Sequence, residues 1–275
     1  MVDVLIRDLP VTSLEVTNWV DGVVRAKKDI LAEETPVALI YNGVSHAVML
    51  ATPQDLEDFA LGFSLAEGII ENAKDLYAVE VKMQVNGVEL HCEIASECFM
   101  RLKEKRRTLA GKTGCGLCGA ENLTQAIRHP KPLRTQLQFP ASAVLSGLQA
   151  MDQYQVLQQQ TGATHASAYV GMGGDIYLIR EDVGRHNALD KLVGALAKQA
   201  YYPQGFVVTT SRASFEMVQK VASAGINLLV AVSAPTALAV RVAEQCGLSL
   251  LGFARGQKFV IYSHKHIILN DELTS

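Results

Sequence analysis

From residue 139 onward, short apolar runs alternate with helical patterns, and this alternation limits the fold more than any other feature of the chain. A long helical pattern over 141–160 comes first, and strand-like runs then end near residues 180, 210, 232 and 253, with amphipathic segments between them. Strands that alternate with helices form a mainly parallel sheet that is covered on both faces. The sequence therefore predicts an α/β domain of three layers over residues 139–275.

The first part of the chain follows a different pattern, in which a hairpin precedes a helix and the order then repeats. Asn42-Gly43 and Asn86-Gly87 are strong signals for hairpin turns. Between them, Thr52 is expected to cap a helix. We therefore predict a smaller α+β domain over residues 1–110, and a flexible loop and connector over 111–138.

The composition sets limits on location and partners. The chain has 49% apolar and 19% charged residues, and its net charge is −3. These values are typical of a folded soluble protein and give no electrostatic case for binding nucleic acid or an anionic membrane. The most apolar window, 226–243, is interrupted by Asn227, Pro235 and Arg241, and we find no pattern of a signal peptide. The expected location is the cytoplasm.

Two cysteines lie in a glycine-rich stretch, Lys112-Thr113-Gly114-Cys115-Gly116-Leu117-Cys118-Gly119. Its glycines give little intrinsic shape, so we expect an exposed loop that carries two reactive sulfurs. A zinc site would need a second pair of ligands, and Cys92 and Cys98 are awkwardly spaced for that role. A thioredoxin-like dithiol would follow a strand and open a helix. A thiol that carries a chemical group is the third interpretation, and all three stay open on the residues alone.

Polar side chains follow the strands of the predicted sheet, and three of the turns each contribute one arginine: Arg185, Arg212 and Arg255. The carboxyl ends of parallel strands meet at one edge, where ligands bind. The arginine fork matches phosphate oxygens, and the helices that start nearby add backbone donors. We therefore expect a ligand with several phosphates, although these arginines could instead form structural ion pairs with nearby carboxylates. Neither a Walker loop nor a Gly-x-Gly-x-x-Gly motif follows a strand.

Two histidines are candidates for the same pocket. His186 lies beside Arg185 at a strand end, and His165 follows a glycine after the long helical segment. A histidine in a core or on a plain surface is the common alternative for both residues.

Five motifs occur in an order that resembles the FdhD family, the formate dehydrogenase accessory sulfurtransferases. The resemblance covers residues 31–262, and its most specific part is Glu181–Lys191. The motifs are Lys112–Gly119, Thr161–Ala166, Glu181–Lys191, Ser211–Glu216 and Phe253–Gly256.

The resemblance implies a sulfurtransferase that acts in molybdenum cofactor maturation. Such a carrier accepts persulfide sulfur from a cysteine desulfurase and transfers it to the cofactor, Mo-bis(molybdopterin guanine dinucleotide), before the cofactor enters formate dehydrogenase. Cys115 matches the cysteine that bears the persulfide, and Cys118 matches the second cysteine of the motif. GDP is then the expected mimic of the bound cofactor, and a homodimer the expected assembly.

The resemblance also assigns a cofactor-binding segment, which here consists of Phe253, Ala254, Arg255, Gly256, Gln257 and Lys258. Arg185, His186, Arg212 and His165 complete the predicted pocket, in which a guanine base could stack on Phe253.

The resemblance further implies a fold like that of cytidine deaminase. Deaminases take their zinc ligands and catalytic Glu from a His-x-Glu and a Pro-Cys-x-x-Cys motif, and neither motif occurs in residues 139–275. We therefore expect no metal at that place and no deamination. The alternative function is a chaperone that binds the molybdenum cofactor and uses its cysteine pair for structural zinc or for redox chemistry.

Overall fold

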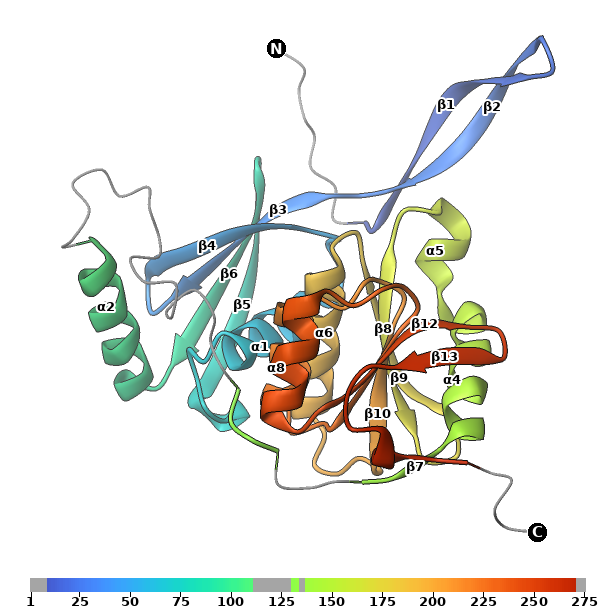
Figure 1. Cartoon of the computed structure of the whole chain (residues 1–275). Helices are drawn as coiled ribbons and strands as arrows, with labels where there is room; N and C mark the ends of the chain where they lie inside the picture. Colours follow the sequence, from blue (N-terminus) through green and yellow to red (C-terminus); the bar gives the residue numbers. More distant parts are fainter. Residues whose placement is uncertain (1–8, 111–129, 134–136, 271–275) are drawn as a thin grey trace.

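The computed structural model of the chain describes residues 9–110, 130–133 and 137–270, with the backbone alone for 105–110. Two α/β units and a projecting hairpin make up the molecule (Figure 1). The predicted loop that contains Cys115 and Cys118 lies outside the described residues. No helix in the described ranges is both long and apolar enough to cross a membrane.

The first unit is a four-stranded sheet with the order β4-β3-β6-β5, in which β3 and β6 run parallel and the other neighbours antiparallel. Burial alternates along β3, as expected for a strand with one face on a core. The elements of this unit are β3 (Thr35–Tyr41), β4 (Val44–Ala51), α1 (Leu56–Ala66), η1 (Ala73–Asp75), β5 (Leu76–Gln84), β6 (Gly87–Ile94) and α2 (Ser96–Ala110). Both predicted hairpins are confirmed, and Asn42 and Gly43 turn with positive φ angles of 45° and 79°.

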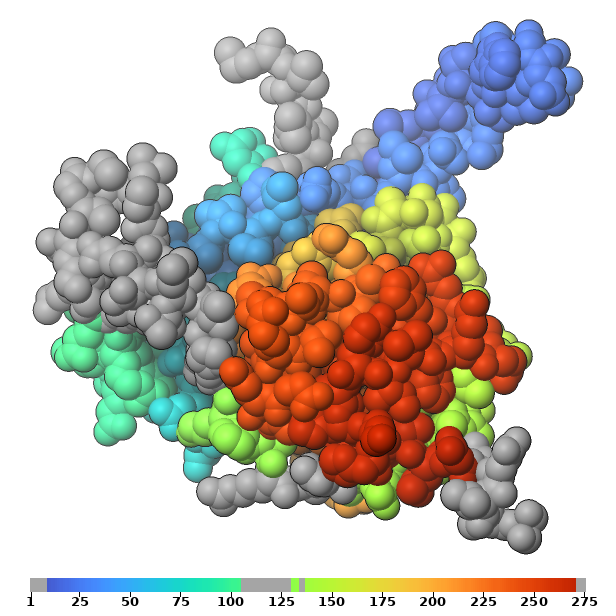
Figure 2. All heavy atoms as spheres, in the orientation of Figure 1, coloured from blue at the N-terminus to red at the C-terminus, as the bar shows by residue number. Residues whose placement is uncertain are grey.

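A long hairpin that the sequence analysis did not predict precedes this unit. It pairs β1 (Val11–Val20) with β2 (Val23–Ala32) through a turn at Asp21 and Gly22, whose φ angles are 50° and 83°. Two positive φ angles define a type I′ turn, which fits the twist of a hairpin. The hairpin stands away from the body of the molecule (Figures 1 and 2). We call this hairpin, residues 11–32, the arm.

The second unit is the predicted α/β domain. Its sheet has the order β13-β12-β11-β10-β8-β9, and β10, β11 and β12 pair in parallel. The outer pairs are antiparallel, so four of the six strands, β9 to β12, point the same way. The six strands are β8 (His165–Gly171), β9 (Ile176–Asp182), β10 (Gly205–Thr209), β11 (Leu228–Ala231), β12 (Ser249–Arg255) and β13 (Lys258–Ile261). Two short strands, β7 (Phe139–Pro140) and β14 (Ile268–Leu269), pair in parallel as a separate sheet.

Helices cover both faces of this sheet, as predicted. They are α4 (Ala141–Tyr154), α5 (Val156–Thr161), α6 (Arg185–Ala197), α7 (Phe215–Ser223), α8 (Ala237–Cys246) and the short η2 (Lys265–Ile267). Helices α6, α7 and α8 pack on one face around Val207, Leu229 and Leu250, and α4 packs on the other face around Phe206 and Val208. The fold class is thus confirmed, whereas the likeness to cytidine deaminase stays a prediction.

The predicted helix over 141–160 is two helices, because the chain breaks at Gln155. The buried Glu181 side chain explains the break. Its carboxylate accepts hydrogen bonds from the backbone N–H groups of Leu157 (2.9 Å) and Gln158 (2.8 Å), which start α5. Glu181, which is distant in sequence, therefore starts a second helix at a point where the local sequence pattern predicts that the first helix continues.

The two units meet where α1 crosses α6. A Cβ atom added to Gly62 would lie 1.7 Å from the carbonyl oxygen of Asp190, and one added to Gly194 would lie 1.9 Å from that of Asp58. Only glycine permits so close an approach of two helix backbones. The contact fixes one unit against the other.

Candidate functional site

The topology brings the polar strand ends to one edge of the six-stranded sheet. Strands β9 to β12 end there, and β8, which runs the opposite way, begins there with His165. The predicted site residues between 165 and 258 therefore share this edge, as the sequence analysis expected. Most of their side chains belong to two groups, one on each face of the sheet, whereas the exposed Phe253, Arg212 and Lys258 belong to neither.

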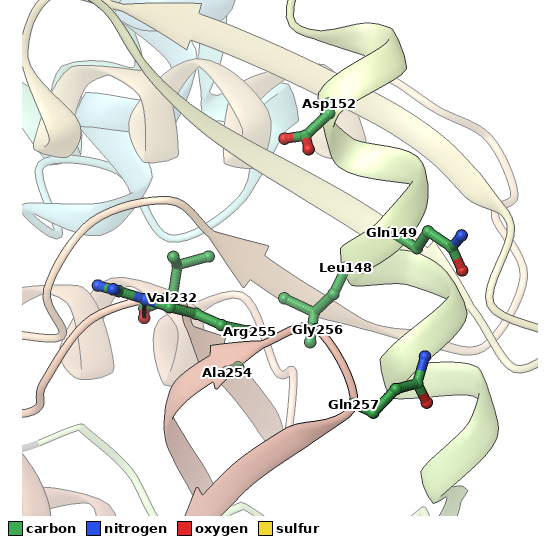
Figure 3. A pocket seen from close by; sticks show the side chains of 8 residues that line it. All are labelled: Leu148, Gln149, Asp152, Val232, Ala254, Arg255, Gly256 and Gln257. Carbon is green, nitrogen blue, oxygen red and sulfur yellow. Dashed lines mark hydrogen bonds between the residues drawn. The ribbon is translucent and has the colours of Figure 1, made fainter.

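The first group surrounds a pocket of about 390 Å³ between α4 and the end of β12 (Figure 3). Four members of the predicted cofactor-binding segment line it, together with three residues of α4 and one residue that follows β11. The lining consists of Ala254, Arg255, Gly256, Gln257, Leu148, Gln149, Asp152 and Val232. The polar residues that line the pocket are one arginine, one aspartate and two glutamines.

A bend in the chain shapes the β12 wall of this pocket. Phe253 has a φ angle of 51°, which is uncommon for an aromatic residue, and its backbone N–H donates to Ser233 O at 3.1 Å. The pairing with β13 shifts register between Gly252 and Arg255. Such a bulge redirects the side chains of a strand: Ala254 is buried, whereas Phe253 is 45% exposed. Phe253 is therefore exposed at the surface and does not line the pocket.

One hydrogen bond holds the Arg255 side chain against the protein. Its Nε–H donates to Val232 O at 3.1 Å, and the side chain is otherwise exposed. The guanidinium has five N–H donors in a fixed fork, so this bond leaves several of them for an anion. Asp152 approaches the pocket from α4, and Figure 3 shows its carboxylate pointing into the gap between the helix and the strand ends.

The second group lies at the starts of α6 and α7, on the opposite face. His186 Nε2 lies 2.7 Å from Glu216 Oε2 and 3.4 Å from Ser214 Oγ. Burial lowers the pKa of His186 below its ordinary value, although the carboxylate of Glu216 opposes the shift. A neutral imidazole oriented by a carboxylate can accept a proton from a bound group.

His165 and Arg185 belong to this second group. Burial lowers the pKa of His165, and the nearby Arg185 guanidinium lowers it further. Arg185 Nε is buried and has no hydrogen-bond partner within the described part of the chain. A buried donor without a partner is costly, which makes this nitrogen a candidate contact for a ligand.

The predicted site residues are thus not all in one cavity. The predicted residues that do not line the pocket beside α4 are Phe253, Arg185, His186, Arg212, His165 and Lys258. Arg212 is exposed in the turn that follows β10, and Lys258 is exposed at the start of β13, where it pairs with Arg255.

Structural ion pairs with nearby carboxylates were the alternative role for Arg185, Arg212 and Arg255. Among the described residues, Glu181 caps α5, Asp182 pairs with the buried Lys191, and Glu216 pairs with His186. None of these carboxylates pairs with one of the three arginines.

The motif over 181–191 is structural at several positions. Asp182 Oδ2 lies 2.7 Å from Lys191 Nζ and accepts from the backbone N–H of Thr52 at 3.0 Å. Lys191 Nζ in turn donates to Thr52 O at 2.9 Å. The prediction that Thr52 caps α1 is therefore wrong, because this residue is held by the other unit and α1 begins only at Leu56.

Sequence reasoning missed Gln149, Asp152 and the role of Glu216. Gln149 and Asp152 are separated by three positions, so they lie on one face of a helix. That spacing was the available signal, but it does not reveal which strand end the helix faces.

The cysteines in the described ranges are buried. Burial raises the pKa of the Cys92 thiol to about 12, and Cys98 Sγ lies 3.3 Å from Arg101 Nη2. A thiol with so high a pKa is a poor zinc ligand, because zinc binds the thiolate. Within the described residues, no group of three or more His, Cys, Asp or Glu side chains could hold a metal ion.

The fold and this edge define a class: a two-unit α/β protein with arginines at the polar edge of its sheet and, in the sequence between the two units, a cysteine pair. The sequence model of the FdhD/NarQ family matches residues 32–269, so the chain belongs to the FdhD/NarQ family. The "Sulfur carrier protein FdhD" of Cupriavidus necator is 54% identical over 92% of this chain and 88% of its own length. The protein of the same name from Bordetella petrii is 56% identical over 88% of each chain.

A solved structure shares the fold. It is described as a formate dehydrogenase accessory protein from Desulfotalea psychrophila, and it matches 94% of this chain and 99% of its own with a TM-score of 0.72. The sequence identity is 22%, so the likeness concerns the fold alone.

Proposed function

We propose that the chain is a sulfurtransferase that serves molybdenum cofactor maturation. It accepts persulfide sulfur on Cys115 from a cysteine desulfurase and transfers it to Mo-bis(molybdopterin guanine dinucleotide), which then enters formate dehydrogenase. Family membership and the sulfur-carrier name of relatives at 54–56% identity support the proposal. The observation that supports binding of the cofactor is the pocket, because residues 254–257 of the predicted cofactor-binding segment form one of its walls.

The chemistry of the pocket suits the guanine nucleotide end of the cofactor. The Arg255 fork matches the oxygens of a diphosphate, and the Asp152 carboxylate can accept from the two N–H groups on the edge of a guanine base. The exposed ring of Phe253, one residue before this wall, is our candidate for stacking on the base. GDP should bind here as a mimic of the cofactor.

The second group suits another part of the same ligand. Four strand steps separate β12 from β9, the strand that precedes Arg185, which corresponds to ~19 Å at ~4.8 Å per strand. The cofactor has two dinucleotide arms, each with a pyrophosphate, so a ligand that spans the edge can reach both Arg255 and Arg185. Neutral His186 and His165 would sit beside the anion and could move a proton there.

The test of the sulfur half is the mass of the intact protein after incubation with a cysteine desulfurase and cysteine. We expect the wild type to gain one sulfur atom, and Cys115→Ala to gain none. Cys246→Ala is the matched control, because this thiol is buried and its pKa is raised by burial. A Cys115→Ala protein that still acquires the sulfur would refute the proposal.

The remaining partners follow from the same proposal. A cysteine desulfurase must supply the sulfur and formate dehydrogenase must receive the cofactor, and we place the reaction in the cytoplasm. The assembly we propose is a homodimer. The alternative of a cofactor chaperone with structural zinc has little support, because Cys92 lies in the core of the first unit with a strongly raised pKa.

A further inference from the structure

The pocket between α4 and the end of β12 contains a carboxylate that an anionic ligand alone does not explain. Asp152 and Arg255 are the charged residues of its lining, and they come from opposite walls (Figure 3). A guanidinium attracts a phosphate, whereas a carboxylate at short range repels it. Because an ionised carboxylate only accepts hydrogen bonds, Asp152 requires a part of the ligand that supplies N–H donors.

Two glutamines hold the last turn of α4, which carries Asp152. Gln155 lies at the break between α4 and α5 and is 6% exposed, and its Nε2 donates to Asp152 Oδ1 at 3.4 Å. Gln159 of α5 donates from its Nε2 to the backbone O of Asp152. Within the described residues, Gln155 is the only hydrogen-bond partner of the carboxylate, so Oδ2 is available to a ligand.

We infer that Asp152 determines which base the pocket accepts, and that this base is guanine. Guanine presents two adjacent donors, N1–H and the 2-amino group, which match the two oxygens of one carboxylate. Adenine and cytosine present one amino group beside a ring nitrogen that accepts, and this nitrogen would face a carboxylate oxygen with no proton between them. The inference rests on the proposed function and deepens it, because it names the residue that selects the nucleotide end of the cofactor.

The positions of the two charged residues also orient the nucleotide. With its base on Asp152 at the α4 wall, the diphosphate points to the Arg255 fork at the end of β12. A volume of about 390 Å³ lies at the small end of the range for ligand pockets, so it suits one nucleotide and not a complete cofactor with two dinucleotide arms. GDP is therefore a sufficient probe of this site.

Exchanging the carboxylate for an amide should change the base preference. In Asp152→Asn the side chain offers an NH₂ group where guanine also has one. Xanthine has N1–H beside a carbonyl oxygen, so it fits the amide and opposes the carboxylate. Calorimetry with GDP, ADP, CDP and xanthosine diphosphate (XDP) should show that the wild type prefers GDP. Asp152→Asn should bind GDP roughly 10- to 100-fold more weakly than the wild type, and XDP more tightly.

The matched control is Asp175→Asn, which makes the same change at an exposed aspartate outside the pocket and should keep the preference of the wild type. Asp152 is also exposed, so Asp152→Asn should unfold at the same urea concentration as the wild type. The inference is overturned by a wild type that binds ADP or CDP as tightly as GDP, by an Asp152→Asn protein that still prefers GDP to XDP, or by a folded Asp152→Asn protein that binds neither.

The proposed function is decided by other measurements on the same samples. A wild type that acquires sulfur on Cys115 and binds GDP, together with an Asp152→Asn protein of unchanged preference, overturns this inference and leaves the proposed function standing. A wild type that binds none of the four nucleotides refutes the cofactor half of the proposed function as well. A wild type that gains no sulfur refutes the sulfur half and does not affect the base preference measured by calorimetry.

Discussion

Lys191 and Asp182 form an ion pair that is completely buried, with 2.7 Å between Lys191 Nζ and Asp182 Oδ2. The pair also holds the backbone of Thr52, which belongs to the other unit. Asp182 further accepts from the backbone N–H of Gly184 at 2.7 Å, just before α6 begins. The pair therefore fixes both the domain contact and the place where Arg185 and His186 enter the site.

Removing the lysine should destabilise the protein strongly. Lys191→Met leaves a buried carboxylate without its partner, and we expect a loss of about 3–5 kcal/mol in the free energy of unfolding. Lys198→Met is the matched control: Lys198 Nζ lies 2.7 Å from Asp58 Oδ1, but its side chain is 40% exposed, so the loss should be about 0–1 kcal/mol. Urea unfolding measures both. Equal losses in the two variants would contradict the structural role of the buried pair.

Arg255 should contribute to nucleotide binding. Arg255→Ala removes the fork from the pocket, and loss of a charged hydrogen bond should weaken GDP binding by ~1–3 kcal/mol. Arg241→Ala, on the exposed side of α8, should bind like the wild type. Calorimetry gives both affinities, and an unchanged affinity for Arg255→Ala would remove this residue from the site.

The interaction of His186 with Glu216 predicts a pKa change. Burial lowers the pKa of His186 and the Glu216 carboxylate opposes this shift, so Glu216→Gln should lower the pKa further. The titration of the ring is followed by NMR. The control is Glu244→Gln, which removes a carboxylate 3.6 Å from His264 instead and should leave the His186 titration unchanged. A rise in the pKa of His186 in Glu216→Gln would contradict the assigned geometry.

A buried carboxylate should make stability depend on pH. Burial raises the pKa of Asp190 to about 6, although Lys220 Nζ lies 2.7 Å from its Oδ1. The folded state therefore holds a proton that the unfolded state releases at its ordinary, lower pKa. Stability attributable to this group is complete below the unfolded pKa and falls as the pH rises toward 6.

Asp190→Asn should abolish this part of the pH dependence. Urea unfolding from pH 4 to pH 6 is compared for the wild type and the variant, and the difference in their stabilities should change across that window. Parallel curves would show that Asp190 does not titrate in the expected range.

Zinc analysis separates the two proposed uses of the cysteine pair. For the sulfur carrier we expect no stoichiometric zinc in the purified protein, and we expect Cys118→Ala to acquire sulfur on Cys115. About one zinc per chain that disappears in Cys118→Ala would instead support the chaperone with a structural metal.

The parts of the fold that were predictable from sequence are those with short-range causes. The alternation after residue 139 indicated the sheet and its helices, and Asn42-Gly43 gave the correct hairpin because both residues tolerate positive φ. The arm carries a similar turn signal, Asp21-Gly22. Because the arm is exposed on both faces and β2 carries several charges, its residues do not alternate clearly between apolar and polar, so the sequence did not indicate these strands.

The errors share a long-range cause. Gln155 breaks a helix because Glu181, distant in sequence, supplies acceptors for the next helix, and Thr52 leaves its expected cap position because Asp182 and Lys191 hold it. Likewise, strand order placed Arg255 and Arg185 at one edge, but the face that each side chain would occupy depended on where α4 and α6 pack.

The contact between Gly62 and Gly194 bears on how the chain folds. Helix α1 belongs to the first unit by sequence, yet its backbone lies directly against α6, so it serves as a layer of both cores. A fragment cut at the sequence boundary near residue 110 would expose this glycine-lined surface to water. The two units should therefore melt in a single cooperative transition, and neither should persist as an autonomous domain.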